Sequence, residues 1–97
     1  MKNDRLIPAA EFCRYYHVED AFINSLHDYG LVEITTIEHT RFIDTEKLAE
    51  LEKFARLHYD LDINVEGIEV ISYMLQKIQD LQNEVIVLRQ RLQLYEI

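Results

Sequence analysis

Tryptophan is absent from this chain of 97 residues, cysteine and proline occur once each, and glycine occurs twice. A single cysteine excludes an internal disulfide and is typical of a reducing compartment, so we expect a cytoplasmic protein. The scarcity of glycine and proline favours helices over a loop-rich or all-β fold. No apolar run approaches the roughly 20 residues of a membrane-spanning helix. The N-terminal stretch MKNDRLIP lacks the apolar core of a secretory signal.

Positively charged residues are also few. Ten Lys and Arg residues stand against 18 Asp and Glu residues, which gives a formal net charge of −8. Such a charge disfavours binding to nucleic acids and other polyanions, and it favours a basic protein surface as partner. Hydrophobic residues nevertheless make up 48% of the chain. We therefore expect one folded domain with a modest core rather than a disordered acidic tail.

The first thirty residues carry the pattern of two short helices joined by a turn. Pro8 suits the first turn of a helix through AAEFCRYY, because its missing N–H costs nothing there. His17-Val18 forms the turn, and Gly30 ends the second helix in a left-handed conformation. The second helix repeats apolar residues at helical spacing, which predicts four core positions: Phe22, Ile23, Leu26 and Tyr29.

The middle of the chain alternates between apolar and polar or β-branched residues. This pattern predicts two short strands, residues 32–36 and 40–43, with a turn near Glu38-His39. Asp44 or Thr45 then caps a third helix that ends near Asp60. Residues 1–64 are thus predicted to form a winged helix-turn-helix with a small β-hairpin wing.

Residues 65–97 form part of the same domain and are predicted to be mostly one long helix. About thirty helical residues span roughly 45 Å, which is more than the remaining chain can cover. The far half carries apolar residues at alternating spacings of three and four, here called the seam: Ile78, Leu81, Val85, Leu88, Leu92 and Tyr95. This spacing is typical of a coiled coil, so we expect a homodimer along the seam. The alternative is a helix that folds back on its own domain.

A series of short sequence motifs adds a family resemblance to this pattern. They occur in order between residues 7 and 92, and they are Glu11-Phe12-Cys13, Gly30-Leu31-Val32-Glu33, Phe42-Ile43-Asp44, Ala55-Arg56-Leu57, Leu61-Asp62, Gly67-Ile68 and Leu88-Arg89-Gln90-Arg91-Leu92. With them, the chain resembles the bacterial chaperone modulator family CbpM, whose domain is of MerR type. One departure is Val65-Glu66, which replaces the family's aromatic–proline pair.

The resemblance implies a mainly α protein that binds the J-domain of a DnaJ-like co-chaperone and blocks its productive encounter with Hsp70. J-domains meet Hsp70 through a basic helix, so an inhibitor needs an acidic face. Two spans without Lys or Arg, residues 15–40 and 57–76, offer carboxylates. The preferred candidates are Asp62, Glu66 and Glu69, with Tyr73 as an aromatic contact. The second candidates are Glu19, Asp20 and Asp28. The alternative for each carboxylate is a solvated surface.

The runner-up function is a MerR-like transcriptional regulator that binds DNA. MerR regulators carry an arginine and aromatics in the second helix, whereas this chain has Asn24 and Ser25 there. Carboxylates facing phosphates oppose binding, and without cations there is little counterion release. Three cations are nearby, namely Arg14, Arg41 and Lys47. They are scattered and do not form the basic patch that is typical of a DNA-binding surface.

Metal binding and catalysis have less support in the sequence. Cys13 and His17 stand four residues apart on the first helix, but no second pair completes a metal site. Cys13 is better explained as a small core residue. There is no glycine-rich phosphate loop and no nucleophile beside a recognisable base, so we expect neither an enzyme nor a cofactor.

Overall fold

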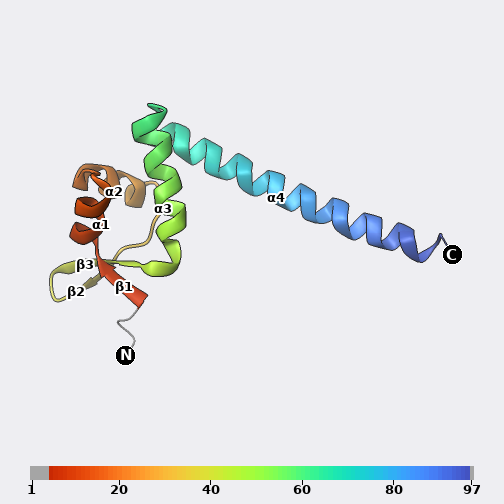
Figure 1. Ribbon diagram of the computed structural model, residues 1–97, viewed down its shortest axis with the longest axis horizontal. Helices are drawn as coiled ribbons and strands as arrows, with labels where there is room; N and C mark the ends of the chain where they lie inside the picture. The colour runs from red at the N-terminus through yellow and green to blue at the C-terminus, as the bar shows by residue number, and fades with distance from the viewer. Residues whose placement is uncertain (1–4, 97) are drawn as a thin grey trace.

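The computed structural model describes residues 5–96, and it divides into a small head and a single projecting helix (Figure 1). We call residues 5–72 the head and residues 73–96 the tail. The chain extends 61 Å along its longest axis and 21 Å along its shortest. The mainly helical fold with a long C-terminal helix is thus as predicted from the sequence.

The head begins with a strand and two helices. Strand β1, Leu6–Pro8, leads into α1, Ala9–Tyr16, and α2 covers Asp20–Asp28. Pro8 caps α1 from an extended conformation, one residue before the helix. His17 ends α1 with a left-handed backbone (φ 58°), and Gly30 follows α2 with φ 75°. The two predicted helices and the glycine stop are therefore confirmed.

A three-stranded antiparallel sheet flanks these helices. Strands β2, Thr35–Ile37, and β3, Thr40–Asp44, form a hairpin, and β1 pairs with the other edge of β3 in the order β1-β3-β2. Glu38 and His39 both adopt positive φ, as a two-residue hairpin turn requires. The predicted hairpin is present, but its first strand begins at residue 35 rather than 32, because Val32 is buried in the core. The sequence prediction missed β1.

Four helical segments follow the hairpin in the described part of the chain. Residues Thr45–Lys47 form a 3-10 turn whose first N–H groups are capped by the Asp44 carboxylate, which accepts from the Glu46 N–H at 2.9 Å. Helix α3, Leu48–Ala55, continues into a π-helical turn, Arg56–Asp60. Helix α4, Val65–Leu94, starts at Asn64, whose side chain accepts from the Gly67 N–H at 2.8 Å. These caps explain why the helices begin where they do.

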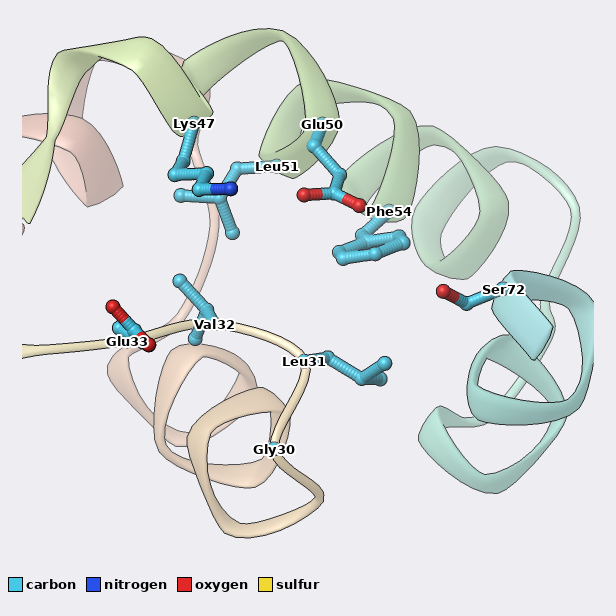
Figure 2. A pocket seen from close by; sticks show the side chains of 9 residues that line it. All are labelled: Gly30, Leu31, Val32, Glu33, Lys47, Glu50, Leu51, Phe54 and Ser72. Carbon is cyan, nitrogen blue, oxygen red and sulfur yellow. The ribbon is translucent and has the colours of Figure 1, made fainter. Parts of the chain in front are cut away.

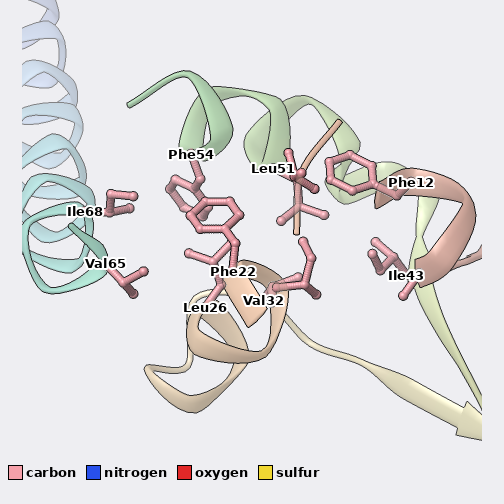
Figure 3. Close-up of a cluster of buried hydrophobic side chains, with 12 residues drawn as sticks. Phe12, Phe22, Leu26, Val32, Ile43, Leu51, Phe54, Val65 and Ile68 are labelled. Carbon is pink, nitrogen blue, oxygen red and sulfur yellow. The ribbon is translucent and has the colours of Figure 1, made fainter. Parts of the chain in front are cut away.

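The head contains one hydrophobic core. Side chains from α1, α2, α3 and the first turns of α4 converge on it (Figure 3). Ile23, Leu26 and Ile68 have no exposed surface, and Phe22 is also buried, as the helical spacing predicted. Tyr29 was predicted as a core residue, and this prediction is wrong, because 38% of its surface is exposed. It lies past the end of α2, where the chain leaves the helical register.

Every tail residue from 73 to 96 is exposed. No helix in the described part of the chain is both long and apolar enough to cross a bilayer. The core therefore contacts α4 only through its first turns, where Val65 and Ile68 are buried.

Candidate partner-binding surface

An exposed tyrosine joins the end of α2 to the start of α4. The Tyr29 hydroxyl donates a hydrogen bond to the Glu66 carboxylate, with 2.9 Å between the oxygens. Two further carboxylates, those of Asp28 and Glu69, are close enough to act electrostatically on the tyrosine. We call these four residues the Tyr29 patch: Asp28, Tyr29, Glu66 and Glu69. They come from two helices that contact each other in the head.

The pKa values in the patch follow from this arrangement. The hydrogen bond to Glu66 is the largest cause that raises the pKa of Tyr29, followed by desolvation and by the charges of the three carboxylates. The pKa of Glu66 is lowered, first by a backbone hydrogen bond at its own residue and then by the Tyr29 hydroxyl. Glu66 thus remains ionised at neutral pH, and the patch is negatively charged.

The Tyr29 patch combines members of both acidic spans identified in the sequence. Asp28 belonged to the second group of candidates, and Glu66 and Glu69 belonged to the first. Tyr29 itself was missed as a surface residue, since its partner lies 37 positions away and no local pattern signals such a contact. The surface is therefore composite, and neither span forms it alone.

Two other preferred candidates, Asp62 and Tyr73, are exposed but do not take part in the contacts of the patch. Asp62 is exposed in the turn before α4, with a left-handed backbone of φ 60°. Tyr73 is 63% exposed, and it stands seven residues after Glu66, which places both on the same side of α4. The Lys77 ammonium lies 5.6 Å from the centre of the Tyr73 ring, in the geometry of a cation–π contact. A positive charge therefore marks the tail side of this surface.

Glu19 and Asp20 are at the opposite end of α2 and do not join the patch. Asp20 accepts from the Arg41 guanidinium at 3.5 Å and from the Cys13 thiol at 3.4 Å. Arg41 also donates to Asn24, which lies on the outer side of α2. Asp20 is thus partly neutralised within the head, and Arg41, one of the three cations nearest a DNA-binding surface, is already engaged.

A partly enclosed cavity of about 300 Å³ lies between the loop after α2, helix α3 and helix α4 (Figure 2). Leu31, Val32 and Phe54 give it an apolar lining, while the charged side chains at its rim carry both signs. The mixed charge does not select an anionic or a cationic ligand. The sequence analysis did not predict this cavity, because it is built from three separate segments.

Cys13 has the environment of a structural thiol. Burial is the main cause that raises its pKa to about 11, and the hydrogen bond to Asp20 adds to the effect. A thiol of such high pKa holds a proton at neutral pH and is a poor metal ligand or nucleophile. Across residues 5–96, no group of three or more His, Cys, Asp or Glu side chains is arranged to hold a metal ion.

The seam lies on the tail and is fully outside the core. Its six side chains range from 44% exposed at Val85 to 87% exposed at Tyr95. A continuous apolar stripe of this length is unusual on the surface of a monomer. The alternative considered from the sequence, in which the far half of α4 folds back onto its own domain, does not occur.

Comparison with known proteins places this architecture in a family. Residues 7–90 match the family described as MerR HTH family regulatory protein, and the chain therefore belongs to the MerR HTH family. The chain is also similar to proteins named chaperone modulatory protein CbpM from Escherichia coli O1:K1 / APEC, Escherichia coli O45:K1 strain S88 and Escherichia coli O81 strain ED1a. It is 29% identical to each over 83 residues, which cover 84% of this chain and 82% of the relative. No solved structure matches the chain.

Proposed function

We propose that this protein is a chaperone modulator that binds the J-domain of a DnaJ-like co-chaperone and blocks its action on Hsp70. The observation that carries the proposal is the Tyr29 patch, in which three carboxylates surround one exposed tyrosine. The similarity to chaperone modulatory proteins supports it, and so does the net charge of −8. The single thiol suits a reducing cytoplasm, where such a partner would be met.

In this proposal the mechanism is occlusion without chemistry. A basic helix of the J-domain lies across the Tyr29 patch, and its Lys and Arg side chains form charge-assisted hydrogen bonds with Glu66, Glu69 and Asp28. Tyr29 contributes a rigid aromatic contact in the centre of the surface. Because the same basic helix is needed to engage Hsp70, the two partners compete for it. The affinity should consequently fall as the salt concentration rises.

The test is a double charge reversal measured by calorimetry with a purified J-domain. Glu66→Lys with Glu69→Lys should lower the affinity by at least tenfold, because attraction becomes repulsion on the same surface. The matched control is Glu11→Lys with Glu38→Lys, which changes the net charge equally but lies outside the patch. The control should bind within a few-fold of the wild type. Unchanged affinity of the patch variant would remove the Tyr29 patch from the proposal.

We further propose that the protein is a homodimer joined along the seam. Burying six exposed apolar side chains against a second copy removes them from water, and α4 reaches far enough from the head for this pairing. A chain truncated after Gln79 keeps the head but loses five of the six seam residues. Sedimentation analysis should find it monomeric, while the full chain sediments as a dimer. A truncated chain that stays dimeric would place the interface elsewhere.

The second candidate function is a MerR-like transcriptional regulator, which the family membership favours. The engagement of Arg41 by Asp20 and Asn24 counts against it. A gel shift at low salt with nucleoid DNA tests this alternative. Binding that survives physiological salt would support it over the chaperone modulator.

A further inference from the structure

The cavity between the loop after α2, helix α3 and helix α4 has an apolar floor. Val32, Leu51 and Phe54 form this floor, and all three belong to the buried core of the head. The half-buried Leu31 extends the apolar lining toward α4. A volume of about 300 Å³ is at the lower end of the range for small-molecule sites. The cavity is therefore suited to a small molecule with an apolar part rather than to a nucleotide or a large cofactor.

Three charged side chains form the rim of this cavity: Glu33, Lys47 and Glu50. Figure 2 shows Lys47 and Glu50 extending from the α3 side toward the cavity, with Glu33 on the loop opposite. Lys47 and Glu50 stand three residues apart, a spacing at which a lysine and a glutamate on a helix ordinarily contact each other. Within residues 5–96, however, none of the three rim residues takes part in an ion pair. Opposite charges therefore border the same cavity without pairing with each other.

A second, smaller cavity continues from the first one between α3 and α4. Its volume is about 210 Å³, and Glu50, Phe54 and Ser72 border both spaces. Leu57 and Leu75 are among its apolar lining residues. Figure 2 shows the Ser72 hydroxyl pointing from α4 toward the space beside Phe54. A ligand whose charged groups lie at the rim therefore has room for an apolar side chain along Phe54.

We infer that this cavity binds a free α-amino acid with an apolar side chain, such as leucine or phenylalanine. The carboxylate of the ligand contacts the Lys47 ammonium, and its ammonium contacts the carboxylates of Glu50 and Glu33. Its side chain packs on Leu51 and Phe54 and is removed from water. A ligand with both charges satisfies the whole rim, whereas a ligand with one charge leaves the opposite sign unmatched. Because the rim is exposed and water screens its charges, we expect a Kd on the order of 1 mM.

NMR titration of the isotope-labelled full chain tests the class of ligand without any partner protein. L-leucine or L-phenylalanine should shift the backbone amide signals of Gly30, Leu31 and Ser72 in a saturable way. N-acetyl-L-leucine lacks the ammonium and L-leucinamide lacks the carboxylate, so each should bind about tenfold more weakly than leucine. Glycine keeps both charges but has no side chain to bury, so it should also bind at least about tenfold more weakly. The absence of a saturable shift with either amino acid at about 10 mM would overturn the inference.

Two variants of the rim test which residue contacts each end of the ligand. Lys47→Met should weaken leucine binding about tenfold but leave leucinamide binding unchanged, because leucinamide has no carboxylate to lose a contact. Glu50→Gln should weaken leucine binding but leave N-acetyl-leucine binding unchanged, because that molecule has no ammonium. The matched controls are Lys77→Met and Glu38→Gln, which lie outside both cavities and should leave every affinity unchanged.

The remaining outcomes of the titration each contradict the inference. Equal affinities for leucine and leucinamide would mean that the cavity selects a cation, and equal affinities for leucine and N-acetyl-leucine would mean that it selects an anion. Shifts confined to residues 73–96 would place the apolar side chain of the ligand on the seam instead of in the cavity. Because both rim residues are exposed, their variants should keep the fold, and circular dichroism checks this.

Discussion

The head and the tail are built from the same apolar residue types, yet their environments are opposite. Leu26, Ile23 and Val32 in the head are at most 6% exposed, whereas Leu88, Ile78 and Val85 in the tail are at least 44% exposed. The head brings helices and a sheet together around one core, while the tail is a single helix. Amphipathic spacing alone therefore does not bury a side chain. An apolar side chain is buried only where a second helix or a sheet covers the apolar face on which it lies.

The largest effect that separates the two regions should come from removing one leucine side chain. Leu26→Ala leaves a cavity in the head, and we expect it to lower the free energy of unfolding by about 2–5 kcal/mol. Leu94→Ala makes the same chemical change in the tail, at a side chain that is 71% exposed and outside the seam. Its effect should stay below about 0.5 kcal/mol. Urea denaturation followed by circular dichroism measures both.

A milder variant keeps this comparison measurable if Leu26→Ala does not fold. Ile23→Val removes one methylene from a side chain with no exposed surface and should cost about 0.5–1.5 kcal/mol. Equal losses for Leu26→Ala and Leu94→Ala would contradict the division into a packed head and a solvated tail.

The next effect concerns a thiol in each region. The pKa of Cys13 is about 11, against an ordinary value of 9.0, so its thiolate should be about a hundredfold rarer than that of an unperturbed cysteine at pH 8. A Leu94→Cys residue introduced in the tail of a Cys13→Ser protein should react with iodoacetamide at an ordinary rate. Rates measured against pH should give an inflection near 11 for Cys13. Similar rates for both thiols would mean that the head leaves Cys13 open to water.

Local patterns were sufficient to predict most elements of the fold. The spacing of Phe22, Ile23 and Leu26 and the stop at Gly30 predicted α2, and the heptads predicted α4. Strand β1 was missed because three residues, one of them Pro8, are too few to display alternation. Its formation depends on pairing with β3, as in the register of Ile7 with Ile43, and that contact is not local.

The candidate site was only half predictable for the same reason. Counting charges identified two acidic spans, but it did not reveal that residues 28–29 of one span meet residues 66–69 of the other. That meeting depends on how α2 packs against α4, and it is visible in the hydrogen bond from Tyr29 to Glu66. The internal pairing of Asp20 with Arg41 was equally hidden, because the two residues are 21 positions apart. Separating the paired carboxylates from the free ones requires the three-dimensional fold.

The smallest effect should come from removing the hydroxyl that joins α2 to α4. In Tyr29→Phe, the pKa of Glu66 should rise toward its ordinary value of 4.5, but it should stay below it, because the backbone hydrogen bond is the larger cause and remains. Carboxyl NMR titration measures this shift, and Tyr95→Phe at the exposed end of the tail is the control.

The sign of the pH dependence follows from the same bond. A carboxylate with a lowered pKa stabilises the folded head above its unfolded pKa, and that contribution is lost as the pH falls through the folded value. In Tyr29→Phe the loss should be complete at a higher pH and be smaller in total, because the folded pKa of Glu66 lies closer to the unfolded one. If the Glu66 titration is identical in Tyr29→Phe and the wild type, the hydroxyl does not hold the patch together in solution, and the four residues would then act as separate surface groups rather than as one site.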